Sequence, residues 1–597
     1  MKKSGRSLAA KRKLISEKKR SKEGKNAAAV AVPPQEQLNR LLGHYQAKQY
    51  AQAEAISVAL SQQYPEHPFA WKVLGAIFQN QGKSQRALEP TRRSVELSPL
   101  DSDAHLNLGA VLRDLGQVEN AENSCREAVR LKPNNALAQF NLGIILRDLG
   151  KLVQARECYE RTLELEPNHV SALLNLSALF LDLNLFDEAE VKARALLVID
   201  SQNSQALQNL GSALMGLERV DEALDIFTEA IRMAPADLVL RCNQGKALQK
   251  LGRLTEAEAC HRTVITAEPE NAEAHLLLAN TLQDLGRFSE AEISYFDAAR
   301  LKSDMPELAE SLLQFSSLSP GHLSIPHPVC ECDRAVREIS FVVPPHAEIS
   351  DEAVHSLLYK FGATLSRFPI STNEDLSQAF RRDSANLDCE RHFKVFNEFG
   401  VVPKHCFGCF KVQIETSSVL DLIKLYLIFD RVDPSEGKTR KCMIEMRPEF
   451  SGLYKGFVYC SEFEEATTLA RSVHRVLVGA MGVGDGISVT VKRGCSEYGL
   501  MFPEYKTLPD NDQLCMDYPS QWAQIEAEYD GRWPNRLLAK RGPTKNGFTL
   551  SDVLTINNWI SFAKGAGDPA AFDIEQGRLF SPLFFERGKH RRESFES

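Results

Sequence analysis

Residues 102–135 read SDAHLNLGAVLRDLGQVENAENSCREAVRLKPNN, and the same 34-residue pattern repeats from residue 34 to residue 305. Glycine keeps one phase, at Gly75, Gly109, Gly143, Gly211 and Gly245, with Ser177 and Ala279 filling two further positions. Alanine keeps a second phase, at Ala53, Ala87, Ala121, Ala155, Ala189, Ala223, Ala257 and Ala291. Self-similarity at this period is typical of an α-solenoid, so we expect about eight stacked helix hairpins.

The quoted unit shows how one hairpin is specified. Its first helix has an apolar stripe at helical spacing, made of Leu106, Leu108, Val111 and Leu112. Gly109 has no side chain, so the second helix can approach closely at that point. Pro133 ends the second helix. One hairpin cannot bury its apolar face alone, so neighbouring units must stack.

This pattern of small, apolar and proline positions resembles the tetratricopeptide repeat over residues 34–305, roughly 45% of the chain. The resemblance implies a right-handed superhelix in which the first helix of each hairpin lines a concave groove. Residues 306–320 are expected to form a capping helix. Residues 1–33 are basic, with eleven Lys and Arg within residues 1–30, and are expected to be a disordered tail.

Asparagine recurs at one position of the first helix, at Asn107, Asn141, Asn175, Asn209 and Asn243. Aspartate recurs seven residues later, on the same helical face, at Asp114, Asp148, Asp182 and Asp284. Asparagine inside a helix is unfavourable, so five residues in phase require a reason. One reading is structural, with the side chains inherited by duplication or bridging neighbouring helices. The other is a ligand surface, because a carboxamide both donates to and accepts from a peptide backbone.

The asparagine series resembles the asparagine ladder in the repeat arm of O-GlcNAc transferases. That resemblance implies that the ladder and the aspartates Asp114, Asp148 and Asp182 bind extended peptide segments. The catalytic part of those transferases has two nucleotide-binding halves, for which residues 351–597 leave little room.

Composition and charge limit the kinds of partner and the cellular location that we expect for this protein. The net charge is −8, and because residues 1–30 carry +9, the rest of the chain is acidic. Nucleic acid is therefore an unlikely partner except through the basic tail. No apolar stretch is long enough to span a membrane, and the thirteen cysteines have no disulfide framework, so we expect a cytoplasmic protein.

The repeat stops after residue 305. Several prolines over residues 321–350 predict a Pro-rich linker. Residues 351–597 then predict an α+β domain, beginning with a helix at residues 353–367. The order strand 410–415, helix 419–429, strand 441–447, strand 456–460, helix 462–478, strand 487–492 predicts a ferredoxin-like arrangement. Ser461 and Glu464 are expected to form a capping box at the second helix.

Two Cys/His pairs in this domain have metal-ligand spacing. Thirteen residues separate the pair Cys389 and His392 from the pair Cys406 and Cys409, and His405 is a spare ligand. Thiolates and an imidazole at this separation suit a structural zinc ion. Buried or free thiols and a redox pair are the alternatives. A thiol-redox motif normally lies at the start of a helix that follows a strand, whereas Cys406 and Cys409 precede a strand. The pair Cys330 and Cys332 near His327 is a poor metal signal.

Two other features have ordinary readings. The glycine run at residues 479–486 follows a helix and opens a strand, the reverse of a nucleotide loop, so we interpret it as a turn. A charged set at the strand ends, Glu445, Arg447, Lys492, Arg493, Glu497 and Tyr498, either lines a ligand site or is solvated.

These observations favour a protein–protein interaction scaffold that binds extended peptides. The alternative is a transferase-like enzyme of unrecognised class, whose repeat arm recruits protein substrates to the C-terminal domain. A third hypothesis is an RNA-associated protein, for which the central strands offer as aromatic residues only Phe457 and Tyr459.

Overall fold

The structure is a computed structural model of the whole chain. It describes residues 32–318, 323–341, 347–370, 378–381, 389–432, 439–447, 452–481, 487–495, 498–506, 508, 517–531 and 547–576. The basic tail over residues 1–31 therefore lies outside the described residues. The chain divides into two compact units at Pro235 and Ala236, and each is described here by itself.

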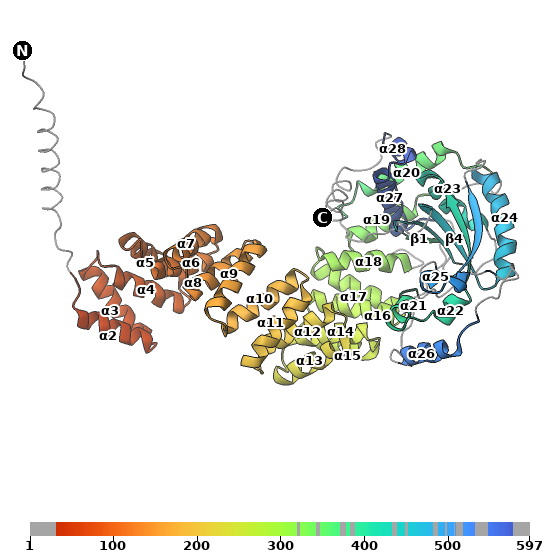
Figure 1. Cartoon of the computed structure of the whole chain (residues 1–597). Coiled ribbons are helices and arrows are strands. Elements are labelled where there is room, and N and C mark those ends of the chain that lie inside the picture. The colour runs from red at the N-terminus through yellow and green to blue at the C-terminus, as the bar shows by residue number, and fades with distance from the viewer. Residues whose placement is uncertain are drawn as a thin grey trace, which may run out of the picture. The chain divides into compact units, whose positions relative to one another are not determined.

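The N-terminal unit, up to Pro235, consists of helix hairpins (Figure 1). Its helices are α2 (Gln35–Gln46), α3 (Tyr50–Gln63), α4 (Pro68–Asn80), α5 (Ser84–Leu97), α6 (Ser102–Asp114), α7 (Val118–Leu131), α8 (Ala136–Asp148), α9 (Leu152–Leu165), α10 (Val170–Asp182), α11 (Phe186–Ile199), α12 (Ser204–Gly216) and α13 (Val220–Met233). Even-numbered helices are the first of each pair. Each packs against its odd-numbered partner and against the next hairpin, as the 34-residue period predicts.

The in-phase glycines lie where the two helices of a hairpin come closest. A Cβ atom built on Gly109 would lie 2.4 Å from Cys125 Sγ, and one on Gly143 would lie 2.7 Å from the Tyr159 ring. The glycine therefore makes room for a residue sixteen positions later on the second helix. Where Ser177 replaces glycine, the residue sixteen positions later is the small Ala193.

The C-terminal unit begins with two further hairpins and continues into the α+β domain. Its first helices are α14 (Leu238–Lys250), α15 (Leu254–Ala267), α16 (Ala272–Asp284), α17 (Phe288–Leu301) and α18 (Pro306–Leu318). The rest of its elements are α19 (Pro328–Arg337), α20 (Asp351–Leu365), β1 (Gln378–Arg381), α21 (Cys389–Phe399), α22 (Lys404–Phe407), β2 (Phe410–Thr416), α23 (Val419–Val432), β3 (Arg440–Ile444), β4 (Tyr454–Cys460), α24 (Phe463–Met481), β5 (Ser488–Arg493), α25 (Tyr498–Met501), the 3₁₀ turn η1 (Pro503–Lys506), α26 (Ser520–Gly531), α27 (Leu550–Gly565) and α28 (Pro569–Gln576).

The five strands form one antiparallel sheet in the order β1-β3-β4-β2-β5. The four strands β2 to β5, with α23 and α24 between them, have the ferredoxin-like order that the sequence predicts. Figure 1 shows α24 beside the sheet, and both α23 and α24 pack on it. Gly456 of β4 lets α23 approach, since a Cβ there would lie 2.5 Å from Leu425. The sequence did not predict the edge strand β1.

Residues 321–350 are more than the predicted Pro-rich linker. Helix α19 lies inside this range, and its buried residues Val329, Cys330, Cys332 and Val336 belong to one continuous apolar core. That core runs from α16 and α18 through α19 to the sheet and α27. Buried Asp333 accepts hydrogen bonds from Leu550 N at 2.8 Å and from Arg337 Nε at 2.6 Å, which fixes α19 against α27. Pro328 therefore opens a packed helix.

Two smaller observations complete the fold. The predicted capping box at α24 used the wrong partner, because Ser461 N donates to Glu465 at 3.2 Å rather than to Glu464. No helix among the described residues is long and apolar enough to cross a membrane.

Replacing Gly143 by alanine is expected to destabilise the hairpin of α8 and α9. The new methyl group would overlap the Tyr159 ring, at a cost of about 1–3 kcal/mol. Gly43 in α2 is the matched control, because nothing lies within 4 Å of a Cβ there and Gly→Ala inside a helix stabilises by about 0.5–1 kcal/mol. Melting temperatures of the full-length variants should move in opposite directions. An equal shift for both would contradict the close approach.

His261 in α15 gives a second stability prediction. It is fully buried, both ring nitrogens lack hydrogen-bond partners, and burial lowers its pKa to about 4. The unfolded state therefore binds a proton more readily, and stability is lost as pH falls from about 6.5 towards 4. His261→Phe, with the residue found at the equivalent position Phe227, should raise stability and weaken this pH dependence. Urea unfolding at pH 7 and pH 5 measures both, and an unchanged pH dependence would refute the assignment.

Candidate functional site

The predicted asparagine row lies on the first helices of successive hairpins. Asn107 is on α6, Asn141 on α8, Asn175 on α10 and Asn209 on α12, and all four are half-buried. Asn243 is also half-buried but lies on α14, in the C-terminal unit. Within the N-terminal unit, the row is therefore carried by four helices at one equivalent position.

Asn209 differs from the other three members of that unit. Its Nδ2 donates to Ser177 Oγ at 2.8 Å and to the Leu174 carbonyl oxygen at 3.4 Å. Within the described residues, the side chains of Asn107, Asn141 and Asn175 have no hydrogen-bond partner. Three carboxamides of the row are thus free to bind a ligand, whereas the fourth bridges two hairpins.

The residue at the glycine position of the preceding hairpin explains this difference. Asn209 meets Ser177, which offers a hydroxyl, whereas the equivalent residues before Asn141 and Asn175 are Gly109 and Gly143. Glycine has no side-chain acceptor. The sequence already shows that Ser177 interrupts the glycine series. Because Ser177 lies 32 residues before Asn209, it is the sequence signal that the Asn209 carboxamide has a partner inside the protein.

The predicted aspartate row has partners inside the protein. Asp148 pairs with Arg113 Nε at 2.5 Å, and Asp182 pairs with Arg147 Nη2 at 2.9 Å. Asp114 accepts from Ser84 Oγ at 3.2 Å. In each case the partner belongs to the preceding hairpin. These contacts account for the recurrence of aspartate without a ligand, although exposed ion pairs of this kind are worth only about 0–1 kcal/mol each.

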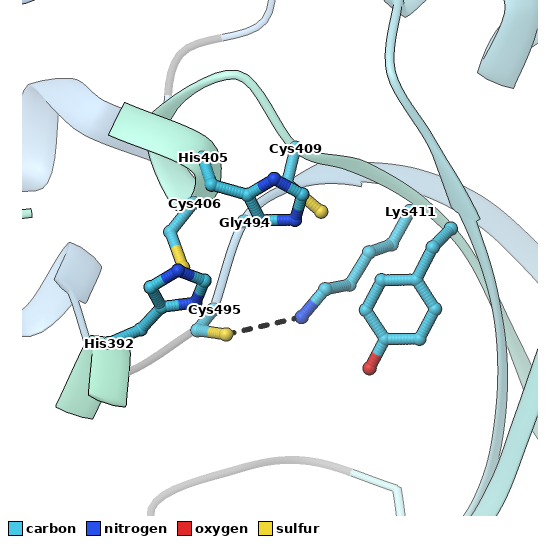
Figure 2. A pocket seen from close by; sticks show the side chains of 8 residues that line it. His392, His405, Cys406, Cys409, Lys411, Gly494 and Cys495 are labelled. Carbon is cyan, nitrogen blue, oxygen red and sulfur yellow. Dashed lines mark hydrogen bonds between the residues drawn. The ribbon is translucent and has the colours of Figure 1, made fainter. Parts of the chain in front are cut away.

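A second cluster of polar side chains lines a small cavity at the end of the sheet (Figure 2). The lining residues are His392, His405, Cys406, Cys409, Lys411, Tyr459, Gly494 and Cys495. Strand pairing explains the gathering, because the first residue of β2, Phe410, pairs with the last residue of β5, Arg493. The residues before β2 and those after β5 therefore meet at one edge.

Burial and neighbouring groups shift the pKa values of Lys411 and His392 in this cavity. Lys411 is 6% exposed, and its Nζ donates to Cys495 Sγ at 3.3 Å and lies 4.9 Å from the Tyr459 ring centre. Burial alone would lower the pKa of Lys411, but Tyr459, Cys495 and Cys409 outweigh it and raise that pKa. The buried His392 stacks on His405 at 5.3 Å, and burial lowers its pKa to about 4, so it is neutral at pH 7.

The structure brings together three of the four predicted zinc ligands. His392, Cys406 and Cys409 line the cavity, whereas the side chain of Cys389, the first residue of α21, lies outside the described residues. No three described His, Cys, Asp or Glu side chains are arranged to hold a metal ion. The zinc site stays a prediction. Sequence reasoning missed Cys495, although the predicted strand order places it beside Cys409.

The charged set at the strand ends is partly paired. Buried Glu445 accepts from Arg447 Nε at 2.7 Å, and Lys455 Nζ lies 3.8 Å from its second oxygen. Glu497 lies outside the described residues, as does most of the glycine run at residues 479–486. Phe457, one aromatic residue of the RNA hypothesis, is 6% exposed and lies 5.4–5.8 Å from Lys492 Nζ and Lys411 Nζ. Its ring is not open to base stacking here.

Comparison with known families identifies the repeats. Family models described as "Tetratricopeptide repeat" match residues 101–166, 140–204, 204–237 and 242–306. These residues are therefore tetratricopeptide repeats, and the asparagine row lies within them. No curated protein matches the chain.

Solved structures of repeat proteins are similar to parts of the chain. A tetratricopeptide repeat protein from Parabacteroides merdae is 20% identical, with 40% of this chain and 95% of that chain covered and a TM-score of 0.35. YrrB, described as a tetratricopeptide repeat protein with an unusual peptide-binding site, is 20% identical over 31% of this chain and 95% of its own, with a TM-score of 0.28. PilF of Pseudomonas aeruginosa is 19% identical over 36% and 97%, with a TM-score of 0.31. With TM-scores this low, these likenesses carry no inference about function.

Proposed function

We propose that this protein is an interaction scaffold whose N-terminal repeats bind extended peptide segments through Asn107, Asn141 and Asn175. One observation carries the proposal: these three half-buried carboxamides have no hydrogen-bond partner among the described residues. None of their side-chain atoms is among the buried polar atoms without a partner, so these amides can be reached from solvent. A peptide can replace the water on them with its own backbone groups.

The chemistry of the row favours peptide backbone as the ligand. Each carboxamide offers two donors and one acceptor oxygen, which matches the carbonyl and N–H groups of a peptide unit. Because the contacts go to the backbone, the row holds a peptide without specifying each of its side chains. The neighbouring aspartates are paired internally, so they add little charge selectivity.

The test is a triple variant, Asn107→Ala/Asn141→Ala/Asn175→Ala. Full-length protein first selects a ligand from an array of random 12-residue peptides, and fluorescence anisotropy then measures its affinity. Loss of three hydrogen-bonding side chains, at about 1 kcal/mol each, should weaken binding about 100-fold. Melting temperature should not fall, since alanine favours helix more than asparagine does.

Asn209→Ala is the matched control. It removes the same side chain from the same row, but a side chain that already bonds to Ser177. It should lower the stability by about 1 kcal/mol and leave peptide affinity nearly unchanged. N-methylation of the peptide backbone should abolish binding to the wild-type protein. If the selected peptide binds the triple variant as tightly as the wild type, the proposal is wrong.

A further inference from the structure

Two cysteines line the cavity at the end of the sheet together, although 88 residues separate them in the sequence. Cys406 lies on α22 and Cys495 follows β5. Figure 2 shows both among the labelled side chains around the cavity. Neither is part of the repeats, so this feature is independent of peptide binding.

The backbone holds these two segments together. Gly494 N donates to the Cys409 carbonyl oxygen at 2.7 Å, and Tyr505 Oη donates to the Cys406 carbonyl oxygen at 2.7 Å. Gly494 has a φ of +49°, and a Cβ on it would lie 1.4 Å from Tyr505 Oη. Only glycine fits there. The two thiols are therefore held in proximity by main-chain contacts that do not depend on the thiols themselves.

The two cysteines have different surroundings. Cys495 is half-buried and accepts a hydrogen bond from the ammonium of Lys411. Cys406 is 6% exposed and bonds to Tyr498 Oη at 3.6 Å. The third cysteine, Cys409, lies 3.9 Å from the Phe410 carbonyl oxygen. Cys495 is thus the more accessible thiol of the pair, and Cys406 is the enclosed thiol behind it.

We propose that Cys406 and Cys495 form a disulfide by exchange with a small-molecule disulfide of the glutathione type, which makes this cavity a redox-modification site. The sulfur of Cys495 attacks one sulfur of the oxidised reagent, whose S–S bond breaks and releases one reduced molecule. The sulfur of Cys406 then displaces the second reduced molecule. The protein loses two protons and two electrons, and the reagent gains them.

The disulfide would join α22 covalently to the segment after β5. The main chain already holds these segments together through the hydrogen bond from Gly494 N to the Cys409 carbonyl oxygen. The bond would fix the start of β2 to the end of β5 and fill the cavity beside Lys411. His392 and His405, which line the same cavity, would then lose access to two of its three thiols.

The experiment treats reduced full-length protein with oxidised glutathione and maps products by peptide mass spectrometry. Wild type and Cys409→Ser should both give the link between Cys406 and Cys495, with loss of two hydrogen atoms. Cys406→Ser should stop at a stable glutathione adduct on Cys495. Cys495→Ser should give neither product. Circular dichroism checks that each variant folds.

Three results would overturn the proposal. The first is a wild-type protein that takes up glutathione at other cysteines but never links Cys406 to Cys495. The second is an unchanged link in a protein carrying Cys495→Ser, which would mean a different pair. The third is stoichiometric zinc in the purified protein that blocks the exchange, since the thiols would then be the metal ligands predicted from the sequence.

Discussion

The N-terminal unit depends on one steric constraint, the close approach of the two helices in each hairpin. A small residue on the first helix faces the residue sixteen positions later on the second, as Gly143 faces Tyr159. Where Ser177 replaces glycine, the residue sixteen positions later is the small Ala193. Equivalent crossings give equivalent hairpins, and that equivalence aligns residues such as Asn141 and Asn175 in one row.

The same position also decides which carboxamides remain free. A glycine presents no side chain to the asparagine of the next hairpin, whereas Ser177 presents a hydroxyl that takes the Nδ2 donor of Asn209. The structural interpretation of the row therefore applies to Asn209, and the proposed ligand surface is limited to Asn107, Asn141 and Asn175. The aspartates Asp114, Asp148 and Asp182 each bond to a side chain of the preceding hairpin, as Asp148 does to Arg113. The proposed ligand surface accordingly contains fewer residues than the sequence pattern predicts.

Periodicity predicted the helices, and the order of strands and helices along the C-terminal domain, because each of these elements has its own local apolar pattern. It failed where a tertiary contact decides the outcome. Helix α19 was hidden by its flanking prolines, and its place in the core depends on the distant contact between Asp333 and Leu550. Cys495 was missed because it is far from Cys406 in sequence, and it is the pairing of β2 with β5 that brings both to one cavity. The arginine partners of Asp148 and Asp182, 35 residues away in the preceding hairpin, are seen only in the structure.

The most direct test of the central claim follows the side-chain amides themselves. Nuclear magnetic resonance of protein labelled with ¹⁵N at asparagine side chains can monitor each carboxamide during titration with a selected peptide. If the row binds peptide, the resonances of Asn107, Asn141 and Asn175 should shift and gain protection from solvent exchange, while that of Asn209 stays in place. Saturating peptide that leaves the three resonances unchanged, or that shifts only Asn209, would contradict peptide binding by the row.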